Sequence, residues 1–408
     1  MKRWKKLLLL LLVLVLISQI PFAYRRYKLG RLNAAIQQLN SQRVSNEASG
    51  EETELIGVVH VHSFLGGHSS GNFEDIIAAA KANHLDFVVM TEHPSRSFNT
   101  ADMTLKGNHD GVMFLNGNEV RTATGDRFLL FPGDQESAED NQRSSQEVLS
   151  RRSSGLAIIA YPGEFKSWSA KGYNGLEVYN VYTNAREINP FVMFFDGLWS
   201  YRQYPDLLFA RFYKRPTDNL KKWDEQIKQS GERIVATAGN DAHANVGLNL
   251  NDASGNTLLG FKLDPYERSF RLVRLHVLTP PSLAGQLSGQ NREEQIMTGI
   301  SSGHCYIGFD LFSATTGFRF AAQDADESRI IGDEIKLDEE VKFTISSPIA
   351  ARIVLLKDGA VIHETTGTSR TEFVVRERGS YRVEVYLVQL PQPVSDEPWI
   401  ISNPIYVR

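Results

Sequence analysis

The sequence predicts an α/β domain followed by a smaller all-β domain, both attached to an apolar N-terminal helix. Three observations indicate this. Short apolar runs alternate with helical patterns over residues 53–305, residues 306–408 show strands separated only by turns, and no charged residue occurs from Leu7 to Tyr24. Repeated strand–helix–strand units with continuously apolar strands predict a mainly parallel sheet or a barrel. A chain of 408 residues is long enough for both domains and a leader segment.

The N-terminal segment, residues 1–24, combines a basic start, MKRWKK, with the uncharged stretch LLLLLLVLVLISQIPFAY. Its length is close to the ~20 apolar residues that cross a bilayer, and it exceeds the ~7–15 of a usual secretory signal. We therefore expect a single-pass signal-anchor, with a cleaved signal peptide and secretion as the alternative. Basic residues flank both ends, so charge does not fix the orientation. A single N-terminal anchor usually leaves the large C-terminal part outside the cytoplasm, which is the orientation we expect.

Residues 25–52 are polar and predict a juxtamembrane linker, either a helix or a tether. The formal net charge of the chain is -4 and no basic patch dominates, which argues against nucleic acid as a main partner. The single cysteine, Cys305, cannot form an internal disulfide and excludes a zinc site built from cysteines. The sequence leaves the oligomeric state open.

The α/β pattern begins at residue 53. Helices are expected at residues 72–84, where Asn72 can cap the N-terminus, at 144–152, where Ser144 and Glu147 form a capping-box pattern, and at 217–231. The expected strands are residues 55–62, 86–93, 111–120, 127–133, 155–163, 175–181 and 233–243.

The C-terminal pattern, residues 306–408, predicts a small β-sandwich. Asp358-Gly359 between two apolar runs is a strong hairpin signal. Apolar and polar residues then alternate from Tyr381 to Leu387, as in a half-buried antiparallel strand. The expected strands are residues 342–348, 351–367, 371–388 and 403–408.

Residues typical of metal ligands stand at the ends of four separate predicted strands. In a parallel α/β fold the carboxyl ends of strands meet at one edge, where ligands bind. Residues i and i+2 of a strand point to the same side, so the first pair should project together. The candidate metal ligands are His60, His62, His68, Glu92, His93, Glu119, Asp241 and His243.

Imidazoles and carboxylates suit Zn, Fe or Mn ions, and this set is too large for one tetrahedral ion. Two divalent ions would use it, and such a pair can activate water and stabilise an in-line displacement at phosphorus. Any one histidine alone is more often a surface or hydrogen-bonding residue. The same type of residue at four strand ends favours a shared site.

These motifs resemble the PHP family, named for polymerase and histidinol phosphatase. The matching stretches are HVHSFLGGHSSGNFEDIIAAAKANHLDFVVMTEH, GNEV and GNDAHA, within residues 53–305. The resemblance implies a distorted seven-stranded β/α barrel, (β/α)7, with up to three metals and, commonly, phosphoester hydrolysis. More loosely, PWIISNPIYVR is similar to the end of membrane-anchored proteins that carry this domain.

By the resemblance, one metal would be held by His60, His62, Glu119 and Asp241, and a second by His68, His93 and His243. Glu119 would also bridge to a third metal. The family usually has a histidine before a proline after the next apolar strand, where this chain has Tyr161-Pro162. Tyrosine is a poor ligand for such an ion, and Glu164 or Glu177 would have to replace it. We therefore expect two metals.

The expected function is a metal-dependent phosphoesterase that acts on a phosphorylated small molecule or polymer, with Asp241, His243 and Glu119 as catalytic residues. Arg96, Arg121 or Arg186 would bind phosphate oxygens unless they are solvated surface charges. The alternatives are a membrane-tethered binding or assembly protein with a weakly catalytic barrel, and a hydrolase of another substrate. The aromatic segment Asn189–Pro216 predicts a buried core helix, a pocket wall or a membrane-facing patch.

Overall fold

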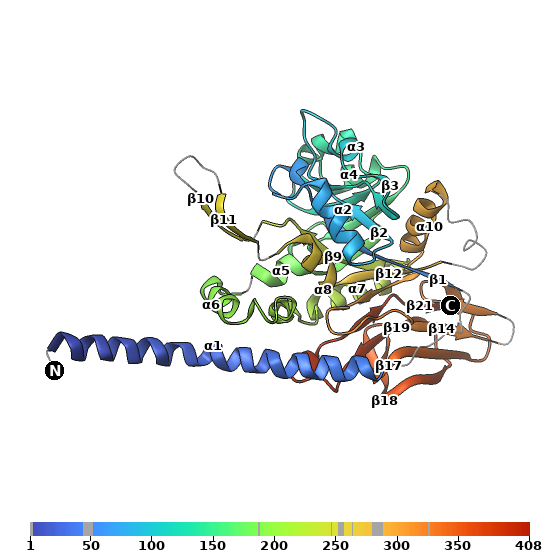
Figure 1. The fold of residues 1–408 in the computed structure, drawn as a ribbon. Helices are drawn as coiled ribbons and strands as arrows, with labels where there is room; N and C mark the ends of the chain where they lie inside the picture. The colour runs from blue at the N-terminus through green and yellow to red at the C-terminus, as the bar shows by residue number, and fades with distance from the viewer. Residues whose placement is uncertain are drawn as a thin grey trace.

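The computed structural model describes residues 3–43, 52–186, 188–245, 247–251, 257–262, 264–279, 289–324 and 327–408. The fold is mixed α/β: most strands belong to one large sheet, helices lie beside it, and a long N-terminal helix extends away from it (Figure 1).

Each helix and strand expected from the sequence has a counterpart, although the expected strands 111–120, 351–367 and 371–388 are each divided between two strands and further elements lie between them. The α-helices are α1 (Arg3–Ser41), α2 (Phe73–Ala82), α3 (Thr100–Met103), α4 (Ser145–Ser150), α5 (Val181–Arg186), α6 (Pro190–Ser200), α7 (Thr217–Ser230), α8 (Tyr266–Leu272) and α10 (Gly289–Ser301), with 3-10 helices η1 (Phe64–Gly66), η2 (Gln135–Gln142), η3 (Pro162–Glu164), η4 (Asp206–Phe212) and η5 (Val394–Asp396). The strands are β1 (Thr53–Val61), β2 (Phe87–Met90), β3 (Gly107–His109), β4 (Val112–Leu115), β5 (Asn118–Arg121), β6 (Arg127–Phe131), β7 (Leu156–Ala160), β8 (Gly175–Asn180), β9 (Val235–Ala242), β10 (Gly247–Asn251), β11 (Thr257–Lys262), β12 (Arg274–Thr279), β13 (Cys305–Gly308), β14 (Arg319–Gln323), β15 (Ser328–Ile330), β16 (Glu334–Ile335), β17 (Val341–Lys357), β18 (Ala360–Val375), β19 (Gly379–Tyr386), β20 (Ile400–Ser402) and β21 (Ile405–Val407).

The predicted helix starts are confirmed by their caps. The Asn72 side chain accepts a hydrogen bond from the backbone N–H of Asp75 at 2.7 Å, which caps α2. Ser144 and Glu147 form a complete capping box at the start of α4. Both caps satisfy backbone N–H groups that have no partner within the helix.

The first half of the sheet is only partly parallel. β1 pairs parallel with β2 and β9, β2 pairs parallel with β4, and β7, β8 and β9 are parallel in turn. β5, β6 and β7 are antiparallel, as is the β1–β12 pair, so the mainly parallel sheet was predicted correctly for only part of this region. The loop between β5 and β6 is too short for a parallel crossover, which explains the antiparallel hairpin. Near the site, an isolated parallel bridge joins Glu92 to Asn118.

The C-terminal half is antiparallel, as predicted, apart from the parallel β16–β21 pair. Asp358 and Gly359 form the predicted hairpin turn with φ of 50° and 83°, the left-handed conformation that this type of turn requires. The predicted boundary at residue 305 falls at the start of β13, which pairs with β12 on one side and β20 on the other. Backbone hydrogen bonds therefore run across this boundary.

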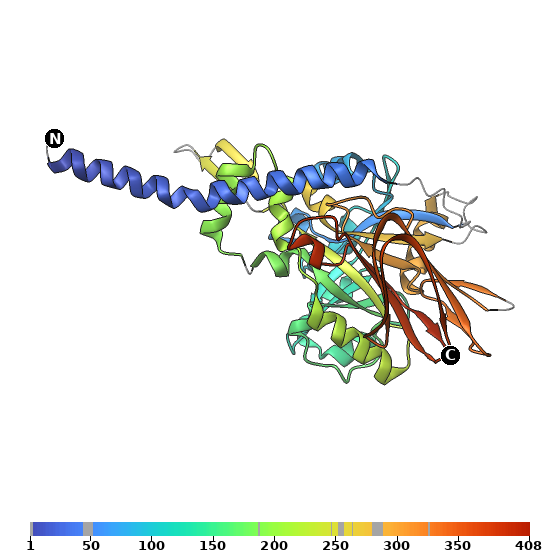
Figure 2. The same cartoon turned by 90° about the horizontal axis from the view of Figure 1, so that it is seen from below.

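The apolar segment and the predicted linker form one continuous helix, α1 (Figures 1 and 2). Every residue from Arg3 to Ser18 is exposed, whereas Phe22, Leu32 and Leu39 are buried against the domain. The helical alternative for the linker is thus confirmed as far as Ser41. α1 is long and apolar enough to span a membrane, as either an anchor or a signal sequence.

Candidate metal centre

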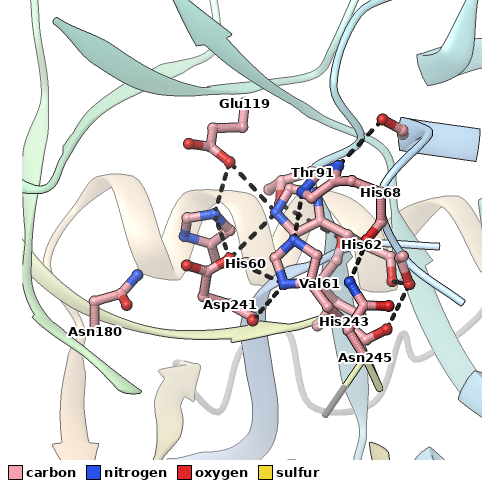
Figure 3. A network of polar contacts seen from close by, with 12 residues as sticks. His60, Val61, His62, His68, Thr91, Glu119, Asn180, Asp241, His243 and Asn245 are labelled. Carbon is pink, nitrogen blue, oxygen red and sulfur yellow. Dashed lines mark hydrogen bonds and ion pairs between the residues drawn. The ribbon is translucent and has the colours of Figure 1, made fainter. Parts of the chain in front are cut away.

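The carboxyl ends of β1 and β9 and the start of β5 bring four ligand-type side chains together (Figure 3). His60 and His62 come from the end of β1, Glu119 from β5 and Asp241 from β9. All four side chains are buried, and their ligand atoms lie within 4.8 Å of one another. The clustering expected from residues far apart in the sequence is present in the structure.

The backbone at this edge departs from the regular strand that the sequence suggested. His60 has φ of 68° and the pairing of β1 shifts register between Val59 and Val61. Asp241 and Tyr161 are also left-handed, with φ of 47° and 50°. Non-glycine residues in this region cost of order 1–3 kcal/mol each, a strain that is concentrated at functional sites. The two imidazoles do lie together, with ring centroids 5.1 Å apart, but a bulge places them rather than strand alternation.

The spacing of the four donors matches the ligand shell of a small cation. His60 Nε2 lies 3.2 Å from Glu119 Oε2 and 3.5 Å from Asp241 Oδ1. His62 Nε2 lies 3.4 Å and 3.5 Å from the same two oxygens. Two ligands of a tetrahedral ion with bonds of about 2.1 Å lie about 3.4 Å apart. The four atoms are therefore spaced as if around one ion.

Unpartnered polar atoms at the centre of this group support the same interpretation. Among the described residues, three buried atoms here have no hydrogen-bond partner: the two ring nitrogens of His62 and Oδ1 of Asp241. An unsatisfied buried polar group costs about 1–3 kcal/mol, so native structures rarely leave one without a reason. A divalent cation would bind Nε2 of His62 and Oδ1 of Asp241, so the residues present fit a metal ion.

Electrostatics within this group also favour a cation. Burial would raise the pKa of Asp241 and of Glu119, but the neighbouring imidazoles outweigh it and hold both pKa values well below the usual range. Burial would lower the pKa of His60 and His62, but the carboxylates outweigh it and raise both. The carboxylates that retain a proton on these imidazoles would equally retain a metal cation.

Glu177 fixes the orientation of His60 from behind. Its Oε1 lies 2.6 Å from His60 Nδ1, and its Oε2 accepts a hydrogen bond from Asn180 at 2.9 Å. A Cβ on Gly239 would lie 1.7 Å from Glu177 Oε1, so this approach requires glycine there. A carboxylate on the far nitrogen is the usual partner of a metal-binding histidine. Glu177 thus orients His60, a candidate ligand, and does not itself act as the replacement ligand that the sequence suggested.

Three further histidines converge beside the first group. His68 Nε2 lies 2.6 Å from His243 Nε2 and 3.2 Å from His93 Nε2. Each Nδ1 faces a backbone carbonyl: His68 that of Gly66, His93 that of Glu119 and His243 that of Asp241. An Nδ1–H that donates to a carbonyl leaves a lone pair on Nε2. Three lone pairs would then face one another, an arrangement that a cation stabilises.

Burial keeps two of these rings neutral. Burial lowers the pKa of His93 to about 4, and burial together with the charge of His62 lowers the pKa of His243 to about 3. His62, His68 and His243 also offer ligand atoms within 4.8 Å of one another. The structure is thus geometrically able to hold metal in the first group that the resemblance assigned, whereas the second group contains His62 in place of His93.

Tyr161 takes part in the site through its hydroxyl, which donates to Asp241 Oδ2 at 2.6 Å. Burial and the carboxylates of Asp241 and Glu119 raise the pKa of this hydroxyl well above its usual range, so it remains a donor. With Oδ2 held by Tyr161, Oδ1 of Asp241 faces the two imidazoles. Glu164, the other expected replacement, lies at the pocket wall, 3.7 Å from Arg186.

Glu92 differs from the other candidate ligands. Its carboxylate accepts hydrogen bonds from the backbone N–H and hydroxyl of Ser63 and from the hydroxyl of Thr104, at 2.5–3.0 Å. These contacts hold together the loops that follow β1 and α3. This occupied carboxylate fits a structural role, and it belongs to neither ligand group found among the described residues.

A cavity of about 520 Å³ opens over both groups. Arg127, which sequence reasoning missed, reaches into it: Nη1 lies 3.0 Å from Glu119 Oε1 and the guanidinium lies over the Tyr161 ring. In the β5–β6 hairpin, Arg127 is diagonal to Glu119 on the same face, a placement that depends on the register of the two strands. The lining residues are His68, His93, Glu119, Arg127, Tyr161, Glu164, Tyr182, Arg186, Asp241, His243, Asn245 and Asp264.

Of the other arginines proposed from the sequence, Arg186 lines the cavity and Arg96 lies elsewhere, 3.5 Å from Glu139. Arg121 is exposed and is not part of the cavity wall.

No protein-family profile matches the chain, and no curated protein matches it. Among solved structures, the chain is similar to PsfC from Pseudomonas syringae, at 13% sequence identity and a TM-score of 0.36. The match covers 63% of this chain and 92% of that one. A likeness at this level identifies neither the fold nor the function.

Proposed function

We propose that the protein is a metal-dependent phosphoesterase of the PHP type, with a distorted β/α barrel that carries the site. The observation that carries the proposal is the group of four buried donors spaced at 3.2–3.5 Å. His60, His62, Glu119 and Asp241 would hold one divalent ion, and His68, His93 and His243 a second. A bound ion of this kind lowers the pKa of a water molecule and withdraws charge from a phosphoryl oxygen.

The protein residues around the cavity supply binding and orientation. Arg127 and Arg186 would bind phosphate oxygens, because a planar guanidinium matches two oxygens at once. Arg127 uses Nη1 for Glu119 and has further N–H groups to donate. Tyr161 holds Asp241 in place, and Asp241 or His243, both at the cavity wall, would accept a proton during turnover. The substrate would be a phosphorylated small molecule or polymer.

We also propose that α1 is retained as a membrane anchor, with the domain outside the cytoplasm. The C-terminal half of the helix is part of the folded domain. The hydroxyl of Ser313 donates to Asn40 at 2.6 Å, and Arg43 just beyond α1 donates to the carbonyl of Thr316 at 2.9 Å. The helix continues without a break from this packed half into the exposed apolar half. A cleavage within it would cut a structural element of the domain.

The test is metal content and turnover of the purified full-length chain in detergent. We expect at least one divalent ion per chain by mass spectrometry, and hydrolysis of p-nitrophenyl phosphate or bis-p-nitrophenyl phosphate with Mn²⁺ or Zn²⁺. His62→Ala should abolish metal retention at the first site and lower turnover by more than about 100-fold, since a whole ligand is lost.

His363→Ala is the matched control, because His363 is an exposed histidine of β18 outside the site. It should leave metal content and rate unchanged. A wild-type chain that binds no metal and hydrolyses neither ester would contradict the phosphoesterase proposal. That result would favour a membrane-tethered binding or assembly protein. Metal without phosphoesterase turnover would instead point to a hydrolase of another substrate.

A further inference from the structure

Helix α6 presents an apolar face to the outside of the molecule. Phe191, Phe194 and Leu198 are 65%, 49% and 71% exposed. Their spacing places them on one side of the helix. The buried core helix expected for this segment is therefore wrong at α6, although η4, which follows it, is largely buried. Among the described residues, none from 189 to 216 lines the cavity over the metal ligands.

α6 packs directly against α1, as both views of the fold show (Figures 1 and 2). The rings of Phe22 and Phe195 pack in a tilted arrangement with centroids 5.0 Å apart, and Trp199 Nε1 donates to the side chain of Gln19 at 3.0 Å. Arg25 donates to Asp196, which is buried, at 2.6 Å. These contacts fix the position of α6 along the long helix.

That position coincides with the place where α1 would leave a bilayer. The exposed apolar stretch runs from about Leu7, and a helix rises ~1.5 Å per residue, so ~20 residues cross the ~30 Å hydrocarbon core. Counted from Leu7, this length ends close to Arg26, about one helical turn beyond Phe22. The residues of α1 that contact α6 are those around Phe22.

Aromatic and basic side chains gather at the same level. Tyr24 and Tyr27 of α1 are exposed, and Lys28 Nζ lies 5.1 Å from the centre of the Tyr24 ring. Arg26 donates to the carbonyl of Trp199, and Arg202 is exposed just after α6. Tyrosine and tryptophan are enriched at membrane interfaces, and lysine and arginine there bind anionic headgroups.

We propose that α6 is a second membrane contact, which inserts Phe191, Phe194 and Leu198 into the outer part of the bilayer beside the point where α1 emerges. The partner is a lipid surface with anionic headgroups. This proposal rests on the retention of α1 proposed above and not on the metal chemistry. An amphipathic helix at an interface typically buries its apolar face ~5–10 Å deep.

A lipid surface fits this face better than a protein partner does. Three side chains offer far less than the ~800 Å² that each partner contributes to a standard protein interface. The face also lies on a helix that packs against α1 directly after the exposed apolar half of α1, residues Arg3 to Ser18. The bilayer that covers α1 would meet α6 at the same depth, so the contact orients the domain on the membrane.

The membrane contact is testable with nitroxide labels on the full-length chain in vesicles of phosphatidylcholine and phosphatidylglycerol. Burial raises the pKa of the Cys305 thiol to about 12, so the native cysteine will not react and single cysteines can be introduced. Leu198→Cys and Phe194→Cys carry the label on α6. Val361→Cys on β18, where Val361 is 60% exposed, is the matched control.

We expect the labels at 194 and 198 to lose accessibility to a water-soluble nickel chelate and gain accessibility to oxygen, relative to the label at 361. Labels at 194 and 198 that are as accessible to nickel as the control, on a chain whose intact mass shows that α1 is present, would overturn the contact alone. A chain that has lost α1 would overturn both the anchor and the contact. Metal content, measured on the same samples, reports on the phosphoesterase proposal separately.

Discussion

At the scale of single residues, the Tyr161 hydroxyl decides where Asp241 points. It occupies Oδ2 and leaves Oδ1 toward His60 and His62. Tyr161 therefore orients a candidate ligand through its hydroxyl. Glu177 acts in the same way on His60. Both contacts lie behind candidate ligands and restrict the rotation of their side chains.

Replacing Tyr161 with phenylalanine removes this hydrogen bond and keeps the ring. Asp241 can then rotate away from the imidazoles, and outer-shell losses of this kind cost roughly 10–100-fold in metal affinity. We expect the dissociation constant for Mn²⁺, measured by isothermal titration calorimetry, to rise by that factor. Tyr182→Phe is the control, because Tyr182 lines the same cavity but is exposed. Equal affinities in all three proteins would show that Tyr161 does not position Asp241.

At the scale of elements, α1 has two halves with different surroundings. The half that begins near Phe22 buries Phe22, Leu32 and Leu39, and partly buried residues such as Leu29 and Ile36 lie between them on the packed side. The preceding half is exposed throughout, with Leu10 at 58%. Such a helix is amphipathic where it packs on the domain and uniformly apolar where it leaves it. This contrast is the basis for treating α1 as a retained element of the fold.

Leu39→Ala should destabilise the domain by roughly 2–4 kcal/mol, because it opens a cavity under a buried leucine. Leu10→Ala should leave the domain's stability unchanged, because that side chain is 58% exposed. Thermal unfolding in detergent, followed by near-UV circular dichroism, compares the two variants. If Leu39→Ala melts at the wild-type temperature, the C-terminal half of α1 is not packed on the domain as described.

At the scale of the whole molecule, a buried polar network joins the start of the α/β part to the antiparallel part. Glu54 of β1 contacts His276 Nδ1 at 2.8 Å and Arg319 of β14 at 2.7 Å, and Asp310 lies 3.4 Å from His276 Nε2. Burial opposes the charged imidazole, but the carboxylates outweigh it and raise the pKa of His276 to about 9. Burial also opposes the charged form of Glu54, yet contact with His276 lowers its pKa to about 2.

The raised pKa of His276 predicts a loss of stability in mildly alkaline solution. Because the unfolded pKa is ~6.5, the stabilising contribution is complete below that pH and disappears as pH rises through about 9. For this buried group the change is of order 3 kcal/mol. We expect the melting temperature to fall between these pH values and His276→Gln to flatten the dependence. A wild-type chain whose melting temperature is constant over that range would contradict a charged His276.

Several features of this fold and site could be predicted from local sequence. Apolar runs marked the strands, Asn72 and Ser144 marked helix starts, and Asp358-Gly359 marked a hairpin, because each signal acts over a few residues. Ligand types at strand ends also indicated the residues of the site. Arg127 was missed because its place beside Glu119 depends on the register of two strands, which the sequence does not display.

The sequence by itself determined which side chains can bind a cation and which segment is apolar enough for a membrane, because residue chemistry and short-range periodicity are local properties. Only the tertiary structure decided that neither ring nitrogen of His62 has a hydrogen-bond partner among the described residues and that the Tyr161 hydroxyl donates to Asp241. It also decided that Ser63 donates to Glu92 and that the apolar face of α6 is exposed beside α1. Those outcomes depend on which atoms distant parts of the chain bring within a few ångströms, because these contacts determine the desolvation and the hydrogen bonding of each side chain.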